Sequence, residues 1–412
     1  MTIQRGITRT IAYKKETIYG TAPAASSAQA MRRVNFVMNK TRPAYASNEL
    51  RTSMQRSDVR LGDVQLAAQL QAELSPKTFG DLFASLLRGS WTAGATTGAQ
   101  TNITAQVADP QVTRGAGSYI TDGFKVGDVI RMTGWATTGA PNNAFNYRIV
   151  AMTATTLTLR NLTGKNAVTF AAKVAGDSVT TTVVNKKLLT PQSAQTAESY
   201  AWEIWNPDIP TSELGLGLRL AGAQLQMNAT GLVTVTFSLV GQDVTTSATQ
   251  YFTSPTAQTT NIALSSAVGA ARLIYSDASF ANDKATITGF NITISGDAQP
   301  ENTAFSLITP DVFSGVLSAQ GQMSVLFEDT YARDAFFKEV EAGLYISLVS
   351  DMTATSDFIG IYLPRIKLTD ASKDDTARAI TETIPFVVLE NMNGGTGTTS
   401  DRATVILQDS AV

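Results

Sequence analysis

The stretch LQAELSPKTFGDLFASLLRG, residues 70–89, joins two kinds of periodicity. Its first residues alternate between apolar and polar, which is typical of a strand with one buried face. Ser75 and Pro76 interrupt this alternation, and apolar side chains then recur at helical spacing up to Gly89. We therefore predict a strand and then a helix that packs on it, with Ser75 as the N-cap and Gly89 after the last turn. The expected apolar face of the helix comprises Phe79, Leu82, Phe83 and Leu86.

A second stretch, QMSVLFEDTYARDAFFKEVEAG at residues 322–343, follows the same plan with different residues. In this alignment Gly343 takes the place of Gly89, and the helix face is formed by Phe336, Phe337 and Val340. The similarity extends in both directions, because the segment from Val34 parallels that from Phe290 and the segment from Tyr200 parallels that from Tyr345. The chain is therefore predicted to contain one structural unit twice.

The first unit is interrupted by a long insertion. Tyr345 follows Gly343 almost at once, whereas more than a hundred residues separate Gly89 from Tyr200. The intervening segment opens with a low-complexity linker, TAGATTGAQT, and continues with short strand patterns separated by turn residues. Residues 90–197 hold nine Lys or Arg and four Asp or Glu, a net charge of +5, which leaves −7 on the rest of the chain. We expect a small, basic, all-β inserted domain.

The expected organisation has six parts. They are an N-terminal arm (1–30), copy one in two pieces (31–90 and 198–250), the inserted β-domain (91–197), a connection (251–285), copy two (286–392) and a C-terminal arm (393–412).

Composition argues against several functional classes. The 412 residues include no Cys and no His, which removes disulfides, thiolate nucleophiles, the usual general base at neutral pH and the commonest transition-metal ligands. No apolar run approaches the roughly 20 residues that cross a bilayer, and the N-terminus lacks a signal-peptide core. We expect a soluble protein made in the cytoplasm, with no enzymatic activity, no metal and no cofactor.

Chemistry based on carboxylates alone has to be considered separately. Asp374 and Asp375 lack the cluster of acidic and aromatic residues that a glycoside hydrolase would need. The same stretch departs from a calcium loop at Asp375, where glycine is required, and at Thr381, where a bidentate Glu belongs. A solvated turn between two strands explains it better. Trp202 and Trp205 are predicted to pack in a sheet or an interface rather than to bind a sugar.

The chain resembles a known family in three stretches. They are RTIAYKKETIYGTAP near the N-terminus, the long segment RRVNFVMNKTRPAYASNELRTSMQRSDVRLGDVQLAAQLQAELSPKTFGDLFASLLRGSWTAG, and LRLAGAQLQMNATGLVTVTFSLVGQD. Together they resemble the major tail tube proteins of long-tailed, non-contractile bacteriophages. The resemblance covers most of copy one, and copy two supports it through the repeat. The inserted segment is similar to the small β-modules that decorate phage virion proteins.

The resemblance implies a mainly β fold. Each copy would be a β-sandwich with one flanking helix, and its sheet would join those of neighbouring subunits in a barrel around a lumen. Family rings are normally sixfold, so a duplicated chain implies a homotrimer that forms a pseudo-hexameric ring, stacked by helical assembly into a tail tube for DNA ejection. The polar strand faces are then expected to line a lumen with net negative charge: Gln65, Gln69, Gln71, Glu73, Ser318, Gln320, Gln322 and Ser324.

The arms and the long loop from Pro43 to Asp63 are expected to make contacts between rings or subunits. Their basic residues are Arg5, Arg9, Lys14, Lys15, Arg42, Arg51, Arg56 and Arg60. In the C-terminal arm, ATVILQ is expected to add a strand to a neighbouring subunit.

The implied partners are further copies of the chain, other tail proteins at the tube ends, and the tape measure protein and DNA inside the lumen. The implied location is the virion tail, with synthesis in the host cytoplasm and no membrane contact. The outward-facing inserted domain would meet anions such as host surface glycans. One alternative is a β-modular surface or fibre adhesin that binds host glycans, and a carboxylate-only hydrolase is another.

Overall fold

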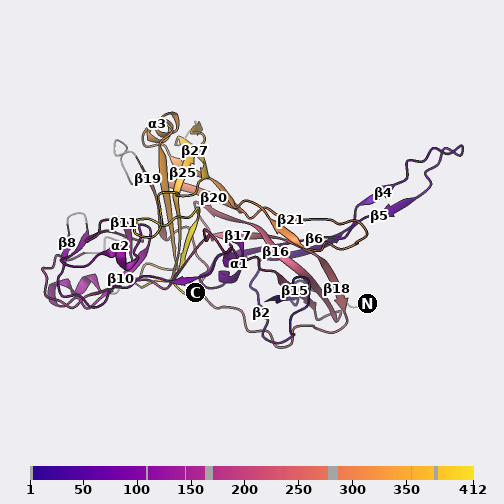
Figure 1. Ribbon diagram of the computed structural model, residues 1–412, viewed down its shortest axis with the longest axis horizontal. Helices are drawn as coiled ribbons and strands as arrows, with labels where there is room; N and C mark the ends of the chain where they lie inside the picture. Colours follow the sequence, from indigo (N-terminus) through magenta and orange to yellow (C-terminus); the bar gives the residue numbers. More distant parts are fainter. Residues whose placement is uncertain are drawn as a thin grey trace.

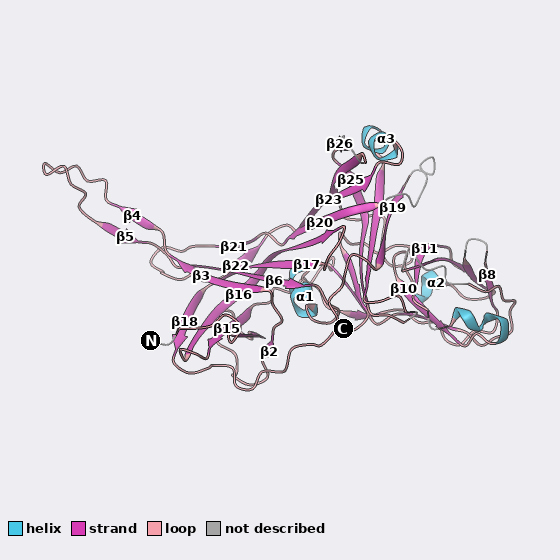
Figure 2. Cartoon of the chain, turned by 180° about the vertical axis from the view of Figure 1, so that it is seen from behind, coloured by secondary structure: helices cyan, strands magenta, loops and turns pink. Residues whose placement is uncertain are grey.

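The protein is described by a computed structural model covering residues 3–107, 110–143, 145–162, 170–276, 286–353, 355–374 and 379–412. The fold is mainly β, with one large sheet system, a smaller separate sheet and short helices (Figure 1), which confirms the predicted fold class. A long hairpin extends from one end of the molecule and the inserted domain lies at the other end (Figures 1 and 2).

Copy one is built on four antiparallel strands in the order β3-β6-β17-β16. Alternating apolar residues in each strand produce one buried face and one polar face, as in β6, where Leu66, Ala68, Leu70 and Ala72 are buried. The bounds are β3 (Asn35–Thr41), β6 (Gln65–Glu73), β17 (Thr234–Gly241) and β16 (Thr211–Asn228).

Copy two repeats this strand order as β20-β23-β27-β25. A short strand, β26, continues the path of β25 along β27, as the second half of β16 does along β17. The bounds are β20 (Ile287–Ser295), β23 (Ser318–Leu326), β25 (Phe358–Leu368), β26 (Ser372–Asp374) and β27 (Thr381–Val388).

The two copies are joined edge to edge. The second half of β16 pairs with β20 in an antiparallel register that runs from Gly222 opposite Ser295 to Asn228 opposite Gly289. The four strands of each copy therefore form one continuous sheet, and its polar face runs from copy one into copy two. We call this β16–β20 contact the internal joint.

A second layer covers the buried face. In copy one, β1 (Thr10–Lys15), β15 (Tyr200–Asn206) and β18 (Asp243–Ser247) pair with each other or with the first half of β16, and β2 (Gln29–Ala30) pairs with β1. Trp202 of β15 is fully buried and stacks on Tyr13 and Phe36, so it is a packing residue as predicted. The segment assigned to an N-terminal arm thus contributes β1 to the fold.

The corresponding layer of copy two holds β19 (Gly269–Tyr275), β24 (Glu341–Val349) and β25. β28 (Ile406–Asp409) lies between β25 and β14 (Lys186–Leu189), and β14 also pairs with β7 (Thr92–Ala93). The expectation that ATVILQ adds a strand to a neighbouring subunit is therefore wrong for β28, because both of its edges are already paired within the chain.

Helix α1 (Gly80–Leu86) packs on the buried face of the copy-one sheet. Phe79 and Phe83 contact Phe237 of β17 at ring-centroid distances of 5.7 and 5.2 Å, and all four predicted apolar residues are buried. The predicted N-cap is wrong. The hydroxyl of Ser75 hydrogen bonds to that of Thr78 at 2.6 Å, and the helix begins after Phe79 with no side-chain cap.

Helix α3 (Tyr331–Phe337) occupies the matching place in copy two but buries Ala332 and Ala335. The prediction that Phe336, Phe337 and Val340 form its buried face is wrong for Phe337, which is 74% exposed, whereas Phe336 and Val340 are half-buried and pack against the core. Both helices end in the same way, with a left-handed residue and a hydrogen bond from the next N–H to the carbonyl five residues back. The left-handed residues, Arg88 (φ 56°) and Glu339 (φ 54°), are therefore equivalent.

This correspondence corrects the predicted alignment of the copies. Val340, and not Gly343, is equivalent to Gly89. Gly343 lies at a β-bulge in β24, and β15 has a bulge at the equivalent position, at Ala201. The segment from Tyr200 therefore corresponds to the segment from Ala342. By the strand pairings, Phe290 of copy two is equivalent to Phe36 of copy one, and not to Val34.

The inserted domain is a six-stranded sheet in the order β13-β10-β11-β12-β9-β8, with its own apolar core. The four predicted strand patterns are confirmed as β10 to β13. The bounds are β8 (Ile103–Gln106), β9 (Gln111–Arg114), α2 (Tyr119–Asp122), β10 (Val129–Thr133), the 3-10 helix η1 (Thr137–Asn142), β11 (Tyr147–Met152), β12 (Thr156–Asn161) and β13 (Thr180–Val183).

Two hairpins leave the sheet at equivalent places. β4 (Ala44–Ala46) and β5 (Val59–Leu61) form the long projecting hairpin between β3 and β6 (Figure 1). β21 (Ala298–Pro300) and β22 (Val312–Ser314) form its counterpart between β20 and β23, which lies along copy one (Figure 2). The first hairpin extends away from the body of the chain, and the second packs on β16 and β17.

Candidate functional site

An extended polar surface covers the open face of the joined sheet. In β6 the residues Gln65, Gln69 and Gln71 are exposed, and Glu73 is partly exposed. The register places Thr234, Thr236 and Ser238 of β17 beside them. The face then continues through Gln224 and Gln226 of β16, opposite Thr293 and Asn291 of β20.

In copy two the same face includes all four residues expected there. Ser318, Gln320 and Gln322 of β23 are exposed and Ser324 is partly exposed. Gln320 and Gln322 lie opposite Thr293 and Asn291 of β20. The structure therefore brings the eight expected lumen residues together on one side of one sheet.

The charge of this face is low. Strand alternation places Glu73, Asp370 and Asp374 on the polar side. Arg219 and Lys367 fall on the same side, opposite Val240 and Val387, and form ion pairs with Asp311 and Glu339. A surface of amides and hydroxyls whose cations are already in ion pairs offers phosphate groups little gain from counterion release.

The basic residues expected at contacts fall into two groups. Near the N-terminus, Arg5 and Lys15 form ion pairs with Asp208 and Glu198, while Arg9 and Lys14 donate to backbone carbonyls of the same chain. These four side chains hold the N-terminal segment on its own fold.

The other four expected basic residues lie at the projecting hairpin. Arg42 donates from Nε to the carbonyl of Gly62 at 2.7 Å, which ties the base of the hairpin together. Arg51 and Arg60 pair with nearby Glu49 and Asp58. Arg56 is exposed.

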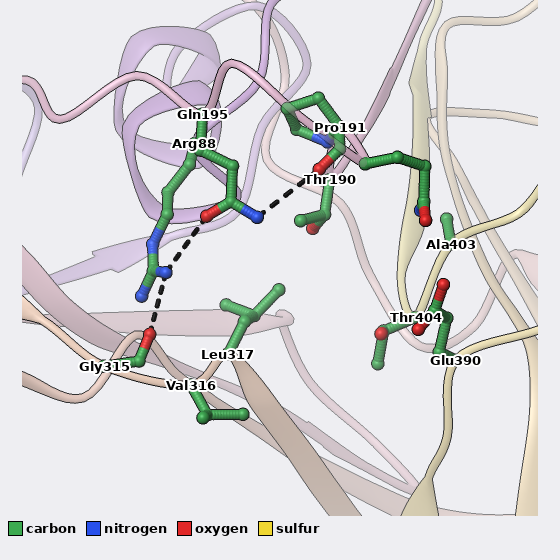
Figure 3. Close-up of a pocket in the computed structure, with 11 residues that line it drawn as sticks. Arg88, Thr190, Pro191, Gln195, Gly315, Val316, Leu317, Glu390, Ala403 and Thr404 are labelled. Carbon is green, nitrogen blue, oxygen red and sulfur yellow. Dashed lines mark hydrogen bonds between the residues drawn. The ribbon is translucent and has the colours of Figure 1, made fainter.

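The internal joint is a functional feature that the sequence analysis missed. Arg88, at the end of α1, donates to the carbonyl of Gly315 at 2.8 Å (Figure 3). It also donates to the carbonyl of Gly296 at 2.5 Å. Burial lowers the pKa of Arg88, with the charge of Asp297 opposing that effect. Arg219 of β16 forms an ion pair with Asp311 at 3.0 Å and donates to the carbonyl of Val312. Two cations of copy one thus bind the copy-two hairpin: Arg88 at its base, and Arg219 at the start of β22, which we call its rim.

Figure 3 shows the hollow beside this joint, lined by residues of both copies and of the C-terminal segment. Gln195 accepts from Arg88 at 3.2 Å, and the Gln195 amide donates to the carbonyl of Pro191 at 3.4 Å. The side chains here hold neighbouring segments together. Within the described part of the chain, no three or more acidic side chains gather as a metal site, and no helix is long and apolar enough to span a membrane.

The inserted domain is docked firmly on copy two. Gln408 of β28 accepts from the N–H of Val129 at 2.8 Å and donates to its carbonyl at 3.0 Å. Arg148 lies 4.1 Å over the ring of Tyr345, and burial lowers the pKa of Arg148 to about 10. Lys187 bridges Asp128 and Asp401 at 3.1 and 2.7 Å.

Comparison with protein families agrees with this architecture. The family model for the phage tail tube protein matches residues 6–388, which is nearly the whole chain. The chain belongs to the phage tail tube protein family. The match runs through both copies and the insertion, so the resemblance noted in copy one is confirmed for the full fold. The sequence matches no curated protein.

As a tail tube protein, the chain is a structural component of a bacteriophage virion tail and self-assembles into a tube with other tail proteins. This accounts for an extended, ordered polar face on the joined sheet. The turn around Asp375, weighed in the sequence as a calcium loop, lies outside the described residues.

Proposed function

We propose that three copies of this tail tube protein close a ring of six tube folds, and that such rings stack into a hollow tube that conducts phage DNA. The observation that carries the proposal is the internal joint. Two folds with the same strand order already meet edge to edge inside one chain, through seven opposed residue pairs. When the same edge-to-edge contact forms between chains, each added chain brings two more folds into the ring.

The outer edges of the joined sheet have the geometry for this step. Within the described residues, β3 pairs with β6 alone and β26 pairs with β27 alone. β26 is the copy-two equivalent of the part of β16 that binds β20, and β3 is the copy-one equivalent of β20. Carrying over the internal register places Asp370 opposite Thr41, Ser372 opposite Asn39 and Asp374 opposite Val37 of the next chain.

Closure of these edges also satisfies a general need of β proteins. An open strand edge presents unpaired N–H and C=O groups that invite uncontrolled association. In a ring, every copy has a neighbour on both sides and the sheet has no edge left. The ring therefore converts two exposed edges per chain into specific contacts.

The polar face would become the wall of the lumen. DNA must slide along this wall, and a wall of Gln, Ser and Thr with isolated carboxylates does not hold phosphate groups. The tape measure protein and DNA would occupy the lumen without specific recognition, and other tail proteins would bind the tube ends. The inserted domain would project outward, where its net charge of +5 favours anionic partners such as host surface glycans.

The experiment is native mass measurement and negative-stain microscopy of the purified protein. We expect particles with three times the 43.8 kDa mass of one chain, and rings or hollow tubes in the images. Rings of six chains, or solid fibres without a lumen, would contradict the proposal.

A further inference from the structure

The internal joint gives a residue-level template for the contact between chains. Three positions of copy one contribute side-chain contacts to it that have counterparts elsewhere in the chain: Leu86 and Arg88 at the end of α1, and Arg219 in β16. Their partners are the base and rim of the copy-two hairpin, at Gly296 and Asp311. Each of these positions has an equivalent at the open edges of the chain.

Arg219 corresponds to Lys367. Arg219 lies opposite Val240 of β17 and Lys367 lies opposite Val387 of β27, and these two valines are themselves equivalent in the sheet. On the partner side, Asp311 directly precedes β22 and Asp58 directly precedes β5. The Arg219–Asp311 ion pair therefore corresponds to Lys367 facing Asp58 of the next chain.

Arg88 corresponds to Glu339, because both are the left-handed residues that end α1 and α3. Gly296 follows the last residue of β20, and Arg42 follows the last residue of β3. At the internal joint the cation comes from the helix and meets a glycine carbonyl. Between chains the helix supplies a carboxylate and the base of the hairpin supplies the cation. The cation thus lies on the hairpin, whereas at the internal joint it lies on the helix.

Leu86 corresponds to Phe337, and the two differ sharply in exposure. Leu86 is 1% exposed, and its Cδ1 lies 3.5 Å from the point where a Cβ on Gly296 would stand. Phe337 is 74% exposed. The position that copy two covers at the internal joint is therefore open at the end of the chain. A large aromatic side chain at this position is therefore accessible to a second chain.

We infer that neighbouring chains are held by Phe337, packed against Arg42 of the next chain, and by two ion pairs, Lys367 with Asp58 and Glu339 with Arg42. The inference rests on the proposed ring. In the free chain Lys367 and Glu339 already pair at 2.6 Å, so assembly extends this pair into a row of four alternating charges. Arg42 is held in place by its hydrogen bond to Gly62, and Asp58 by its ion pair with Arg60 at 2.8 Å.

The free-chain exposures fit such a joint. The side chains of Lys367, Glu339 and Asp58 are 40%, 74% and 54% exposed, whereas Arg219 at the internal joint is 12% exposed. All are accessible to a second chain before assembly. Desolvation on contact then strengthens each ion pair relative to the same pair in water.

A charge exchange tests the pairing in the full chain. We expect Lys367→Glu alone to raise the concentration needed for half-maximal ring formation by about tenfold, because a carboxylate then faces both Glu339 and Asp58. Asp58→Lys alone should act similarly. The double variant should recover most of the loss. Arg402→Glu is the matched control, since it reverses a cation in an ion pair of similar length, 2.8 Å, and similar exposure, 43%, in the C-terminal segment.

A second variant tests the aromatic contact. Phe337→Ser removes an exposed side chain, so we expect an unchanged melting temperature for the single chain and ring formation weakened by at least about tenfold. Assembly is followed by mass photometry over a concentration series, with circular dichroism to check the fold.

The possible results are distinguishable. If the wild-type chain forms no ring, both the proposed function and the inferred contact fail. If the wild type forms rings, and the single charge variants assemble as well as Arg402→Glu or the double variant is no better than either single one, the ion pairs are wrong and the ring stands. If Phe337→Ser assembles like the wild type, the aromatic contact is wrong.

Discussion

Replacing Lys187 with methionine should loosen the inserted domain from the body of the protein. Lys187 in β14 lies between Asp128 of the inserted domain and Asp401 of the C-terminal segment. Burial by itself would lower the pKa of Lys187, and the two carboxylates outweigh that effect and raise it. Methionine keeps the volume of the side chain and removes only the charge that both carboxylates share.

The expected cost follows from burial. Asp128 is 3% exposed and Asp401 is 13% exposed, so neither carboxylate can recover full hydration when the cation is lost. Removing one partner of a buried ion pair costs about 3–5 kcal/mol, and we expect about 3–4 kcal/mol here because Lys187 retains 12% exposure. Domains are stable by roughly 5–15 kcal/mol, so this loss is large.

The assay is urea unfolding of the single chain, followed by the fluorescence of Trp135 in the inserted domain and of Trp202 in the body. Lys186→Met is the control on the adjacent residue, with an expected change below about 0.5 kcal/mol. Asp128→Asn combined with Lys187→Met should recover part of the loss, since one uncompensated charge is removed. The loss should also shrink at acid pH, because burial raises the pKa of Asp128 and protonation removes its charge. A loss below about 1 kcal/mol at neutral pH would refute the reasoning.

Three further predictions concern the sheet, a buried carboxyl and the polar face. Phe237→Ala should cost about 3–5 kcal/mol, because it opens a cavity beneath Phe79 and Phe83, and a thermal melt measures it. Burial raises the pKa of Asp409 to about 6, so the stability it contributes is present below pH 3.8, its usual value, and is lost as the pH rises through about 6. Over this pH range the wild type should therefore lose stability relative to Asp409→Asn. Above it, the stabilities of the two proteins should change with pH in parallel, as measured by denaturation at a series of pH values. Gln69→Lys should make assembled tubes retain double-stranded DNA at low salt and release it as salt rises, whereas wild-type tubes retain none.

Much of the architecture is legible in the sequence because the patterns are local. Alternation in residues 65–73 predicts a half-buried strand, and the apolar spacing after Pro76 predicts the face of α1. The four strand patterns of the insertion are equally local. The duplication is visible because both copies use the same order of such patterns.

The alignment of the copies was harder to predict, for two physical reasons. The break between strand and helix is shorter in copy two, so counting back from a glycine shifts the helix face. Gly343 resembles a helix-ending glycine, but it occupies a strand bulge where copy one has Ala201. A bulge shifts the alternation by one residue and leaves no separate signal in the sequence.

The joint between copies depends on contacts over long sequence distances. Arg88 and Gly296 are far apart in the chain, and nothing local marks either as a partner of the other. The exposure of Phe337 is likewise a property of position, because the same helical place is buried at Leu86. The helix pattern identifies an apolar side chain, and only the assembly determines what covers it.

The central claim is that β26 of one chain pairs with β3 of the next in the register of the internal joint. The chain has no cysteine, so the variant Asn39→Cys with Ser372→Cys tests this directly under mild oxidation. Directly opposed residues of antiparallel strands have Cα atoms about 4.5–5.5 Å apart, within the range that a disulfide bridges. We predict covalent species that end at three chains, and little cross-linking in the control Asn39→Cys with Lys373→Cys, whose side chains would point to opposite faces. Equal cross-linking in the two variants, or none in the first when rings are present, would contradict the account.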